Sequence, residues 1–199
     1  THMAAALILR GIKCGQSVMY QEGISLLNCI LSRWELSSRL PSFHFDFNNF
    51  ALCVVADIIE NKEPVLYERL KQIVLQTKDS NHSTTNWLPM RWFVNHKRYK
   101  WTNENKFKNK CRDCRIGIER ATNKDGGIED RLPKGLSFNL QYDVATVGVL
   151  QFLRQRGIEY NLSKELNFLL NAVAPDGDIN YQGRGANQIF AWGPWIYLL

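Results

Sequence analysis

The sequence contains no long apolar run, only five cysteines and only four histidines. Each of these features argues against some classes of protein, namely membrane-spanning, disulfide-rich and metal-binding proteins. No stretch of about 18 apolar residues occurs, so we predict no transmembrane helix. No secretory leader is visible, and we interpret residues 1–3 (Thr-His-Met) as a cloning remnant. The sequence itself therefore assigns no compartment. We expect the natural protein to extend past the apolar segment that ends at Leu199.

The cysteines do not form a recognisable framework. There are five, an odd number, which argues against a set of disulfides. Cys29 and Cys53 fall within apolar runs and are expected to be small buried hydrophobes. Cys111 and Cys114 form a single C-x-x-C, whereas a zinc site of this type needs a second pair. We therefore predict no metal and no cofactor.

The charge is basic and unevenly spread. The formal net charge is +6, and much of the surplus lies in residues 91–115, where Lys and Arg alternate with Trp, Tyr and Phe. A basic surface attracts acidic polysaccharide, nucleic acid or anionic lipid. The sequence has 45% hydrophobic and 22% charged residues, which is the range of a folded globular domain rather than a disordered chain.

Helical periodicity dominates the chain, and no segment predicts a convincing sheet. Residues 78–101 are rich in aromatic side chains and are predicted to be a long loop, either a packed cover or a binding lid that includes Trp92. The apolar spacing predicts a short helix within 4–13 and further helices over 16–34, 43–60, 63–77, 103–121, 138–156, 162–173 and 188–199.

A short pattern occurs twice. DGGIED at 125–130 leads through a polar segment into one apolar helix, and DGDINY at 176–181 leads through another polar segment into the last helix. Such recurrence is typical of a repeated supersecondary unit. We predict an all-α fold of tandem antiparallel helical hairpins in one domain, residues 4–199, that forms an incomplete (α/α) toroid. The polar segments would then meet at one end of the toroid.

Three polar stretches precede apolar helices and are candidates for a site. Taken singly, an Asn near a helix start is usually a cap and an Asp-Gly is usually a turn. Their recurrence at one place in successive hairpins favours a shared cleft. The stretches comprise His44, Asp46, Asn48 and Asn49; then Glu129, Asp130, Arg131, Lys134, Asn139, Gln141, Tyr142 and Asp143; then Asn180, Tyr181, Gln182, Arg184, Asn187 and Gln188.

Two of these stretches resemble a known family. FNNFALCVVADII, residues 47–59, resembles the Asn-Asn-His helix of alginate lyases. DGGIEDRLPKGLSFNLQYDVATVGVL, residues 125–150, resembles the segment of those enzymes that runs from Asp-Gly into a Tyr-containing helix, and chondroitin and hyaluronan lyases carry a comparable stretch. All are (α/α)-toroid polysaccharide lyases, which cleave uronic-acid polymers by β-elimination. The resemblance implies a periplasmic or extracellular protein.

The resemblance also implies roles for particular residues. Asn49 or Asn48 would neutralise the substrate carboxylate, and Tyr142 would be the base or the acid. Arg131 or Lys134 would lower the pKa of that tyrosine. The candidate catalytic residues are thus Tyr142, Asn49, His44 and Arg131, and the candidate substrate contacts are Asn48, Trp92, Lys134, Asn139, Gln141, Tyr181, Arg184 and Gln188.

The chain departs from the family at two positions. Phe50 stands where alginate lyases have His after the Asn pair, and His44 is a candidate substitute. Gly135 and Leu136 stand where those enzymes have an Arg close to the Tyr. Binding of an acidic glycan without cleavage therefore stays open.

Two further functions are compatible with the residues. An inverting glycoside hydrolase on an (α/α) toroid would use a pair of carboxylates drawn from Asp46, Glu129, Asp130 and Asp143. A non-catalytic domain would bind an acidic glycan or nucleic acid through residues 91–115. Because no recognised nucleic-acid fold surrounds that segment, we predict an acidic polysaccharide or oligosaccharide as the partner.

Overall fold

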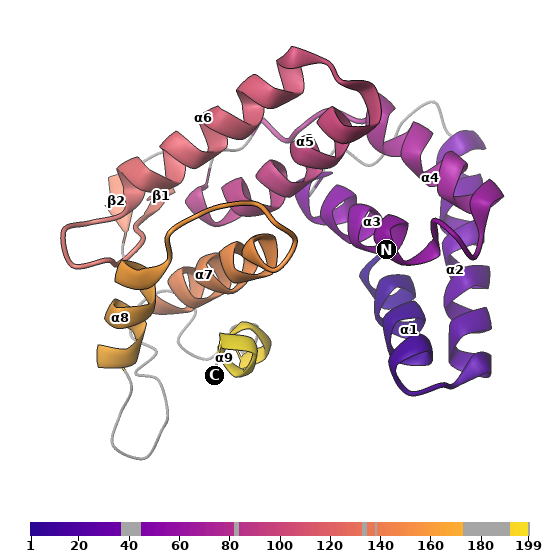
Figure 1. Ribbon diagram of the computed structural model, residues 1–199, viewed down its shortest axis with the longest axis horizontal. Helices are drawn as coiled ribbons and strands as arrows, with labels where there is room; N and C mark the ends of the chain where they lie inside the picture. Colours follow the sequence, from indigo (N-terminus) through magenta and orange to yellow (C-terminus); the bar gives the residue numbers. More distant parts are fainter. Residues whose placement is uncertain (37–44, 82–83, 133–134, 138, 173–191, 199) are drawn as a thin grey trace. The chain divides into compact units, whose positions relative to one another are not determined.

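The computed structural model describes residues 1–36, 45–81, 84–132, 135–137, 139–172 and 192–198, with only the backbone given for 131–132, 135–137, 192 and 195 (Figure 1). The described chain is predominantly α-helical. Its elements are α1 (His2–Lys13), α2 (Ser17–Leu36), α3 (Phe45–Ile59), α4 (Pro64–Gln76), the 3-10 turn η1 (Thr85–Trp87), α5 (Leu88–Thr102), α6 (Asn105–Ala121), β1 (Asp130–Leu132), β2 (Gly135–Ser137), α7 (Leu140–Arg154), α8 (Ser163–Asn171) and α9 (Trp192–Leu198).

The all-α class is thus confirmed for the described residues, and the toroid stays a prediction. One local prediction was wrong. Residues 78–101 are not one loop, because α5 begins at Leu88. The polar segment after DGGIED contains the strands β1 and β2, which pair as an antiparallel hairpin in which Asp130 faces Ser137 and Leu132 faces Gly135.

Contacts within the chain separate two compact units. Unit 1 comprises residues 1–81 and 93–107, and unit 2 comprises residues 82–92 and 108–199. The boundary passes through α5 and α6, so each of these helices contributes to both units.

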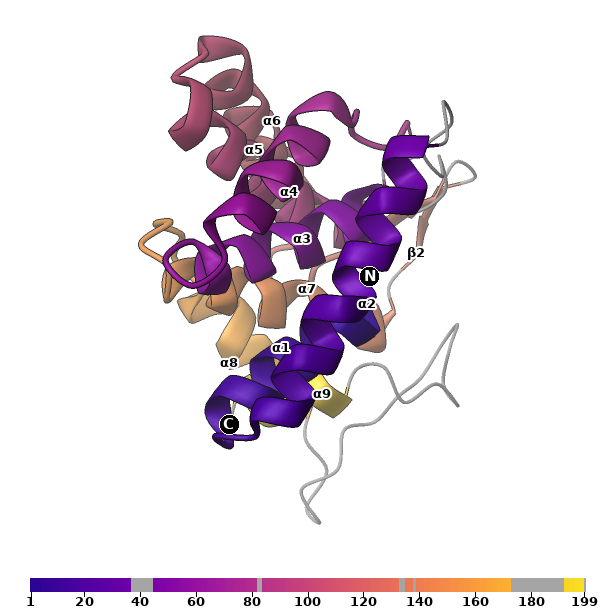
Figure 2. The same ribbon diagram turned by 90° about the vertical axis from the view of Figure 1, so that its right-hand side faces the viewer.

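Unit 1 begins with an antiparallel hairpin of α1 and α2, which lie side by side in Figure 1 and Figure 2. The two helices approach closely at glycines. A Cβ on Gly11 would lie 2.5 Å from the backbone nitrogen of Tyr20, and one on Gly23 would lie 2.7 Å from Cγ1 of Ile8. Larger residues at either position would force the helices apart.

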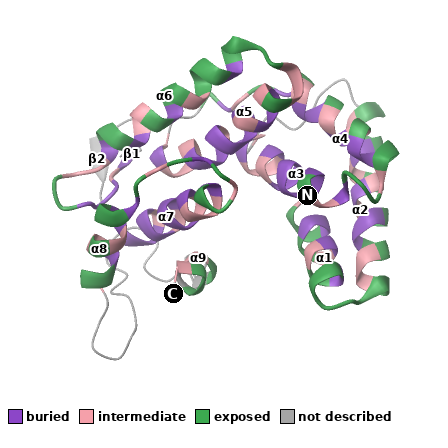
Figure 3. Cartoon of the chain, in the orientation of Figure 1, coloured by how far each residue is buried: buried purple, intermediate pink, exposed green. Residues whose placement is uncertain are grey.

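The core of unit 1 is built around α3, which is buried along most of its length (Figure 3). It packs against α1 and α4. Phe50 lies edge-to-face against Phe93 of α5, with ring centroids 5.6 Å apart. The core also contains fully buried aliphatic side chains from α2, α3 and α4, namely Leu27, Leu31, Leu52, Ile59, Leu70 and Val74.

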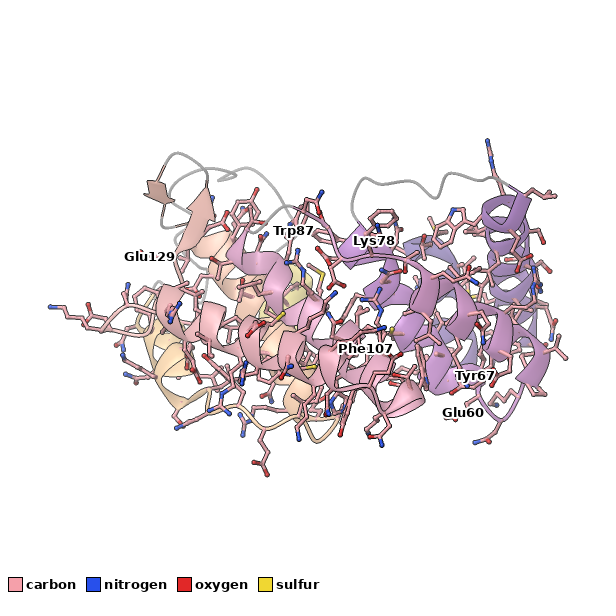
Figure 4. The ribbon with its side chains drawn as sticks, turned by 90° about the horizontal axis from the view of Figure 1, so that it is seen from above. Glu60, Tyr67, Lys78, Trp87, Phe107 and Glu129 are labelled. Carbon is pink, nitrogen blue, oxygen red and sulfur yellow. The ribbon has the colours of Figure 1, made fainter. Side chains whose placement is uncertain are left out.

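Aromatic and charged side chains join α3, α4 and α5. Tyr67, which Figure 4 labels, packs edge-to-face on Trp101 with centroids 6.4 Å apart. Lys97 lies over the same Trp101 ring at 5.2 Å and forms an ion pair with Asp57 of α3. Burial raises the pKa of Tyr67, and the charge of Glu60 adds to that rise. The tyrosine is therefore held as a neutral phenol.

Arg98 of α5 closes the end of α4. It is 1% exposed, its Nε donates to the carbonyl of Val74 at 3.0 Å, and its terminal nitrogens donate to the carbonyl of Thr77 at 2.6 Å and to the carboxylate of Asp79. The last carbonyls of a helix have no partner within that helix. A buried guanidinium here satisfies two carbonyls and a carboxylate together, which fixes α5 against α4.

Unit 2 is built around α7, which contacts η1, α8 and α9. Four of its apolar residues, Val144, Val147, Leu150 and Leu153, are fully buried. A Cβ on Gly148 would lie 2.7 Å from Cβ of Pro194, so this glycine admits α9 at close range.

Replacement of Arg98 by Met should destabilise the protein by about 3–5 kcal/mol, because the Asp79 carboxylate and the carbonyls of Val74 and Thr77 lose the buried guanidinium that binds them. The measurement is the urea midpoint followed by circular dichroism. The matched control is Arg33→Met in α2, where the arginine is exposed and the change should stay within about 0.5 kcal/mol. Equal midpoints for both variants would contradict a structural role for Arg98.

Candidate functional site

The Asp-Gly-Gly motif is a tight turn held by one asparagine. The side-chain Oδ1 of Asn123 accepts hydrogen bonds from the backbone N–H groups of Asp125, Gly126 and Gly127 at 2.9, 3.0 and 3.0 Å. The Asn123 N–H donates in turn to the Gly127 carbonyl at 2.9 Å. An asparagine that satisfies its own turn in this way makes a rigid loop of defined shape.

This turn is packed onto the start of α8. Gly126 has a φ of +106°, and a Cβ there would lie 2.4 Å from the carbonyl oxygen of Lys164. The Lys164 ammonium donates to the carbonyl of Asn123 at 3.0 Å. Only glycine fits both the left-handed backbone and the close approach. The motif that carries the resemblance thus has a structural role, which is to fix the turn against α8.

The hairpin that follows leads directly into α7. Asp130, at its start, accepts the N–H of Thr85 at 3.1 Å and so anchors η1. Asn139 caps α7, because its Oδ1 accepts the N–H groups of Gln141 at 3.1 Å and Tyr142 at 3.4 Å. Gln141 is buried, whereas Tyr142, in the first turn of α7, is partly exposed. The cap therefore fixes the position from which Tyr142 projects.

The two predicted asparagines of α3 differ in their surroundings. Asn49 is 1% exposed, and its Oδ1 accepts the hydroxyl of Thr77 at 3.0 Å, next to the Arg98 cluster. Asn48 is partly exposed, and its Oδ1 accepts the hydroxyl of Thr1 at 2.7 Å. Asn49 therefore has a structural partner in the core of unit 1, and Asn48 is the more accessible of the two.

Several predicted site residues lie outside what the structure describes. Of Arg131 only the backbone is described, within β1. Trp92 is 6% exposed and belongs to the core of unit 2, so it is not part of an open lid. The residues outside the described ranges are His44, Lys134, Tyr181, Arg184 and Gln188.

The carboxylates proposed for hydrolysis belong to different units of the chain. Asp46 is buried in α3 of unit 1. The other three belong to unit 2, where Asp130 bonds to Thr85 and Glu129 is partly exposed. Asp143 has the environment expected of a proton-transferring carboxyl group, because it is 1% exposed and lies in the first turn of α7.

Burial raises the pKa of Asp143 well above its ordinary value. The backbone N–H of Ile128 opposes this rise, and the charge of Glu165 adds to it. Among the described residues, neither Asp143 oxygen accepts a hydrogen bond of normal geometry. A carboxyl group in such surroundings is held protonated to a higher pH than usual and is able to donate a proton.

Glu165 of α8 is a further buried carboxyl group, and it was not among the residues predicted from the sequence. It is 4% exposed, and its Oε1 accepts the hydroxyl of Tyr160 at 3.0 Å. Burial raises the pKa of Tyr160, and Glu165 raises it further. The signal was present in the sequence, because Glu165 falls on the apolar face that Leu162 and Leu169 define.

Two adjoining cavities border Tyr160. One has a volume of about 470 Å³ and the other of about 290 Å³, and they share Arg115, Tyr160 and Asn161. The first also contacts Arg154 and Glu159 and the second Lys164 and Glu165. Tyr160 packs edge-to-face on Trp92 at 6.0 Å between centroids, so the ring is braced by the core. Tyr142 does not line either cavity.

The described residues contain no group of three or more His, Cys, Asp or Glu side chains placed to hold a metal ion. Within the same residues, no helix has the length and apolar character to cross a membrane. Comparison of the chain with protein-family models, curated proteins and solved structures gives no match.

Replacement of Asp143 by Asn should stabilise the protein increasingly as the pH rises. The folded-state pKa of Asp143 is raised, so wild-type stability is greatest below the ordinary carboxyl pKa, about 4, and falls as the pH rises through the folded value. The Asp143→Asn protein has no ionisable group at this position, so its stability does not fall for this reason as the pH rises. We therefore expect little difference between the two proteins near pH 4 and a gain in the stability of Asp143→Asn that grows toward neutral pH.

The measurement is the urea midpoint of both proteins between about pH 4 and pH 8. Asp113→Asn on α6 is the control, since this side chain is 68% exposed and an exposed charge contributes little to stability. Parallel curves for Asp143→Asn and wild type would show that Asp143 is ionised in the folded protein throughout.

Proposed function

We propose that this chain binds an acidic, uronic-acid-containing polysaccharide and cleaves it by β-elimination, and that its helical hairpins belong to an incomplete (α/α) toroid. The observation that carries the proposal is the arrangement at the start of α7. There the glycine turn, the hairpin and the Asn139 cap fix a partly exposed Tyr142 at the end of a polar segment. The resemblance of residues 125–150 to the corresponding segment of the lyases adds to it.

The reaction requires a proton to be removed from the carbon next to a carboxylate. The C–H bond breaks, a C=C bond forms, and the glycosidic C–O bond breaks on the neighbouring carbon. The departing oxygen takes up a proton. In the proposal, Tyr142 transfers the proton, as base, as acid or in both steps.

The substrate carboxylate has to be neutralised, because removal of the proton otherwise creates an unstable dianion. Hydrogen-bond donors of α3 are assigned to this task. We favour Asn48 for direct contact, since it is partly exposed, while Asn49 is buried and bonded to Thr77. The other candidates from the sequence stay part of the proposal, namely His44, Arg131, Lys134, Tyr181, Arg184 and Gln188.

Hydrolysis is the second candidate, and a specific observation favours it. Burial raises the pKa of Asp143, as expected for a general acid of a glycoside hydrolase, and the charge of Glu165, a second carboxyl group, adds to that rise. Lyase and hydrolase action leave different products. Elimination creates an unsaturated end that absorbs ultraviolet light, whereas hydrolysis creates a reducing end without that absorbance.

Tyr142→Phe should abolish cleavage, with a loss of at least about 100-fold in rate, because general acid or base catalysis contributes roughly that factor or more. The assay follows ultraviolet absorbance during incubation with alginate, polygalacturonate, hyaluronan and chondroitin sulfate. Tyr99→Phe is the matched control, since Tyr99 is half-buried in unit 1 and has no assigned role.

Full activity in Tyr142→Phe would refute the role of this tyrosine. New reducing ends without absorbance, lost in Asp143→Asn, would favour hydrolysis instead. Wild type that forms neither product from any polymer in the panel would leave a binding function without cleavage.

A further inference from the structure

We infer that unit 2 carries a separate binding site for an anionic sugar, formed by the two cavities around Tyr160. None of the residues that line them was assigned to the elimination reaction. The inference rests on the proposed substrate class, an acidic glycan, and adds a second place where the polymer is held.

The loop that forms the site is built in one defined shape. Gly157 has a φ of +76°, which lets the chain turn sharply after α7. The side chains of Ile158 and Leu162 are 5% and 1% exposed and anchor the two ends of the loop in the core. Asn161 accepts the N–H of Ser163 at 3.1 Å and so begins α8. Between these anchors, Glu159, Tyr160 and Asn161 line the first cavity.

Tyr160 is held in place before any ligand arrives. Its hydroxyl donates to Glu165, and its ring packs on Trp92. Among the described residues, the second oxygen of Glu165 has no hydrogen-bond partner, although the residue is 4% exposed and lines the smaller cavity. An aromatic ring that is braced in this way presents a rigid apolar wall, which suits the C–H face of a sugar ring, and its polar neighbours suit hydroxyl groups.

The cations on the wall select an acidic sugar. Arg115 is 54% exposed, and in its described contacts it uses only Nε, which donates to Glu119 at 2.7 Å. Arg154 is exposed, and one terminal nitrogen donates to the neutral amide of Gln151 at 3.2 Å. Guanidinium groups bind carboxylates through paired N–H donors. Arg115 and Arg154 line the same cavity together with Glu159. The adjoining cavity adds Lys164, Glu165 and Glu119, the carboxylate that pairs with Arg115.

The exposed face of α6 extends the positive surface beyond Arg115. Its portion in unit 2, residues 108–121, contains five basic and two acidic residues. Lys108, Lys110 and Arg112 are exposed, and Figure 4 shows side chains extending from this helix. A neutral sugar would gain nothing from this charge. A polymer with a carboxylate on each unit is attracted along the helix toward the cavity.

The test is binding of fluorescently labelled hexasaccharides to the full chain. The probes are oligogalacturonate and oligomannuronate, with neutral cellohexaose and an oligothymidylate of equal charge as comparisons. All proteins carry Tyr142→Phe, so that cleavage does not consume the probe. The double variant Arg115→Glu/Arg154→Glu should weaken binding of at least one uronate probe by about tenfold or more, since two charge-assisted contacts are lost.

The control is Arg10→Glu/Arg33→Glu, which makes the same change in net charge at two exposed positions of unit 1. It should alter the Kd by no more than about twofold. Equal losses in both double variants would show a general charge effect and overturn the inference. Equally tight binding of cellohexaose or oligothymidylate, or no binding of either uronate, would also overturn it.

Binding and cleavage are measured in separate experiments. The binding site around Tyr160 and the proposed lyase activity can therefore be refuted independently. Uronate binding that depends on Arg115 and Arg154, in a wild type that cleaves nothing, keeps this site and refutes the lyase. Cleavage by wild type with binding unaffected by the double variant keeps the lyase and refutes this site. Tyr160→Phe offers a milder second variant, because it removes the hydroxyl and keeps the ring.

Discussion

The close packing of Gly126 on the backbone of Lys164 is the constraint on which unit 2 depends. A Cβ at Gly126 would lie 2.4 Å from the carbonyl oxygen of Lys164. Because this oxygen belongs to the backbone of α8, it cannot move aside without shifting the helix. The turn, held by Asn123, and the start of α8 therefore behave as one rigid piece. The hairpin and α7 continue from one end of this piece, and the loop at residues 157–162 enters it from the other. Both candidate sites are positioned by the same backbone contact.

Two of the buried carboxyl groups of unit 2, Asp143 and Glu165, have no such structural explanation. They come from different helices, and burial raises the pKa of Asp143 because it disfavours the charged form of that carboxyl group. Structural ion pairs also perturb pKa values, but among the described residues no cation pairs with either group. Proteins retain such unfavourable arrangements mostly at functional sites. The pair is therefore a stronger indication of chemistry than the capping Asn139 or the buried Asn49.

Sequence periodicity predicted most of the helices, and the reason it missed α5 is physical. This helix is buried on several sides, and its polar residues do not mark a solvent face, since Lys97 and Arg98 are 9% and 1% exposed. Without an amphipathic stripe, its consecutive aromatic residues resemble a loop. The site was predicted less well for a related reason. The predicted site residues were polar residues at helix starts, but one of them, Asn139, is a helix cap. Glu165 was not predicted, because it lies on an apolar helix face and is buried.

The repeated Asp-Gly pattern now has a different meaning from the one that its recurrence first indicated. In the first copy the glycine is required by packing, and Asn123, two residues before Asp125, holds the turn. In the second copy the sequence has Ala174 at the matching position, which carries no side-chain acceptor. The two copies thus share the Asp-Gly pair. In the first copy this glycine, Gly126, is required by its positive φ and by its close approach to the backbone of Lys164. The polar segments that follow the two Asp-Gly pairs differ in sequence. A substrate-specific function would therefore depend on these segments rather than on the repeated pair.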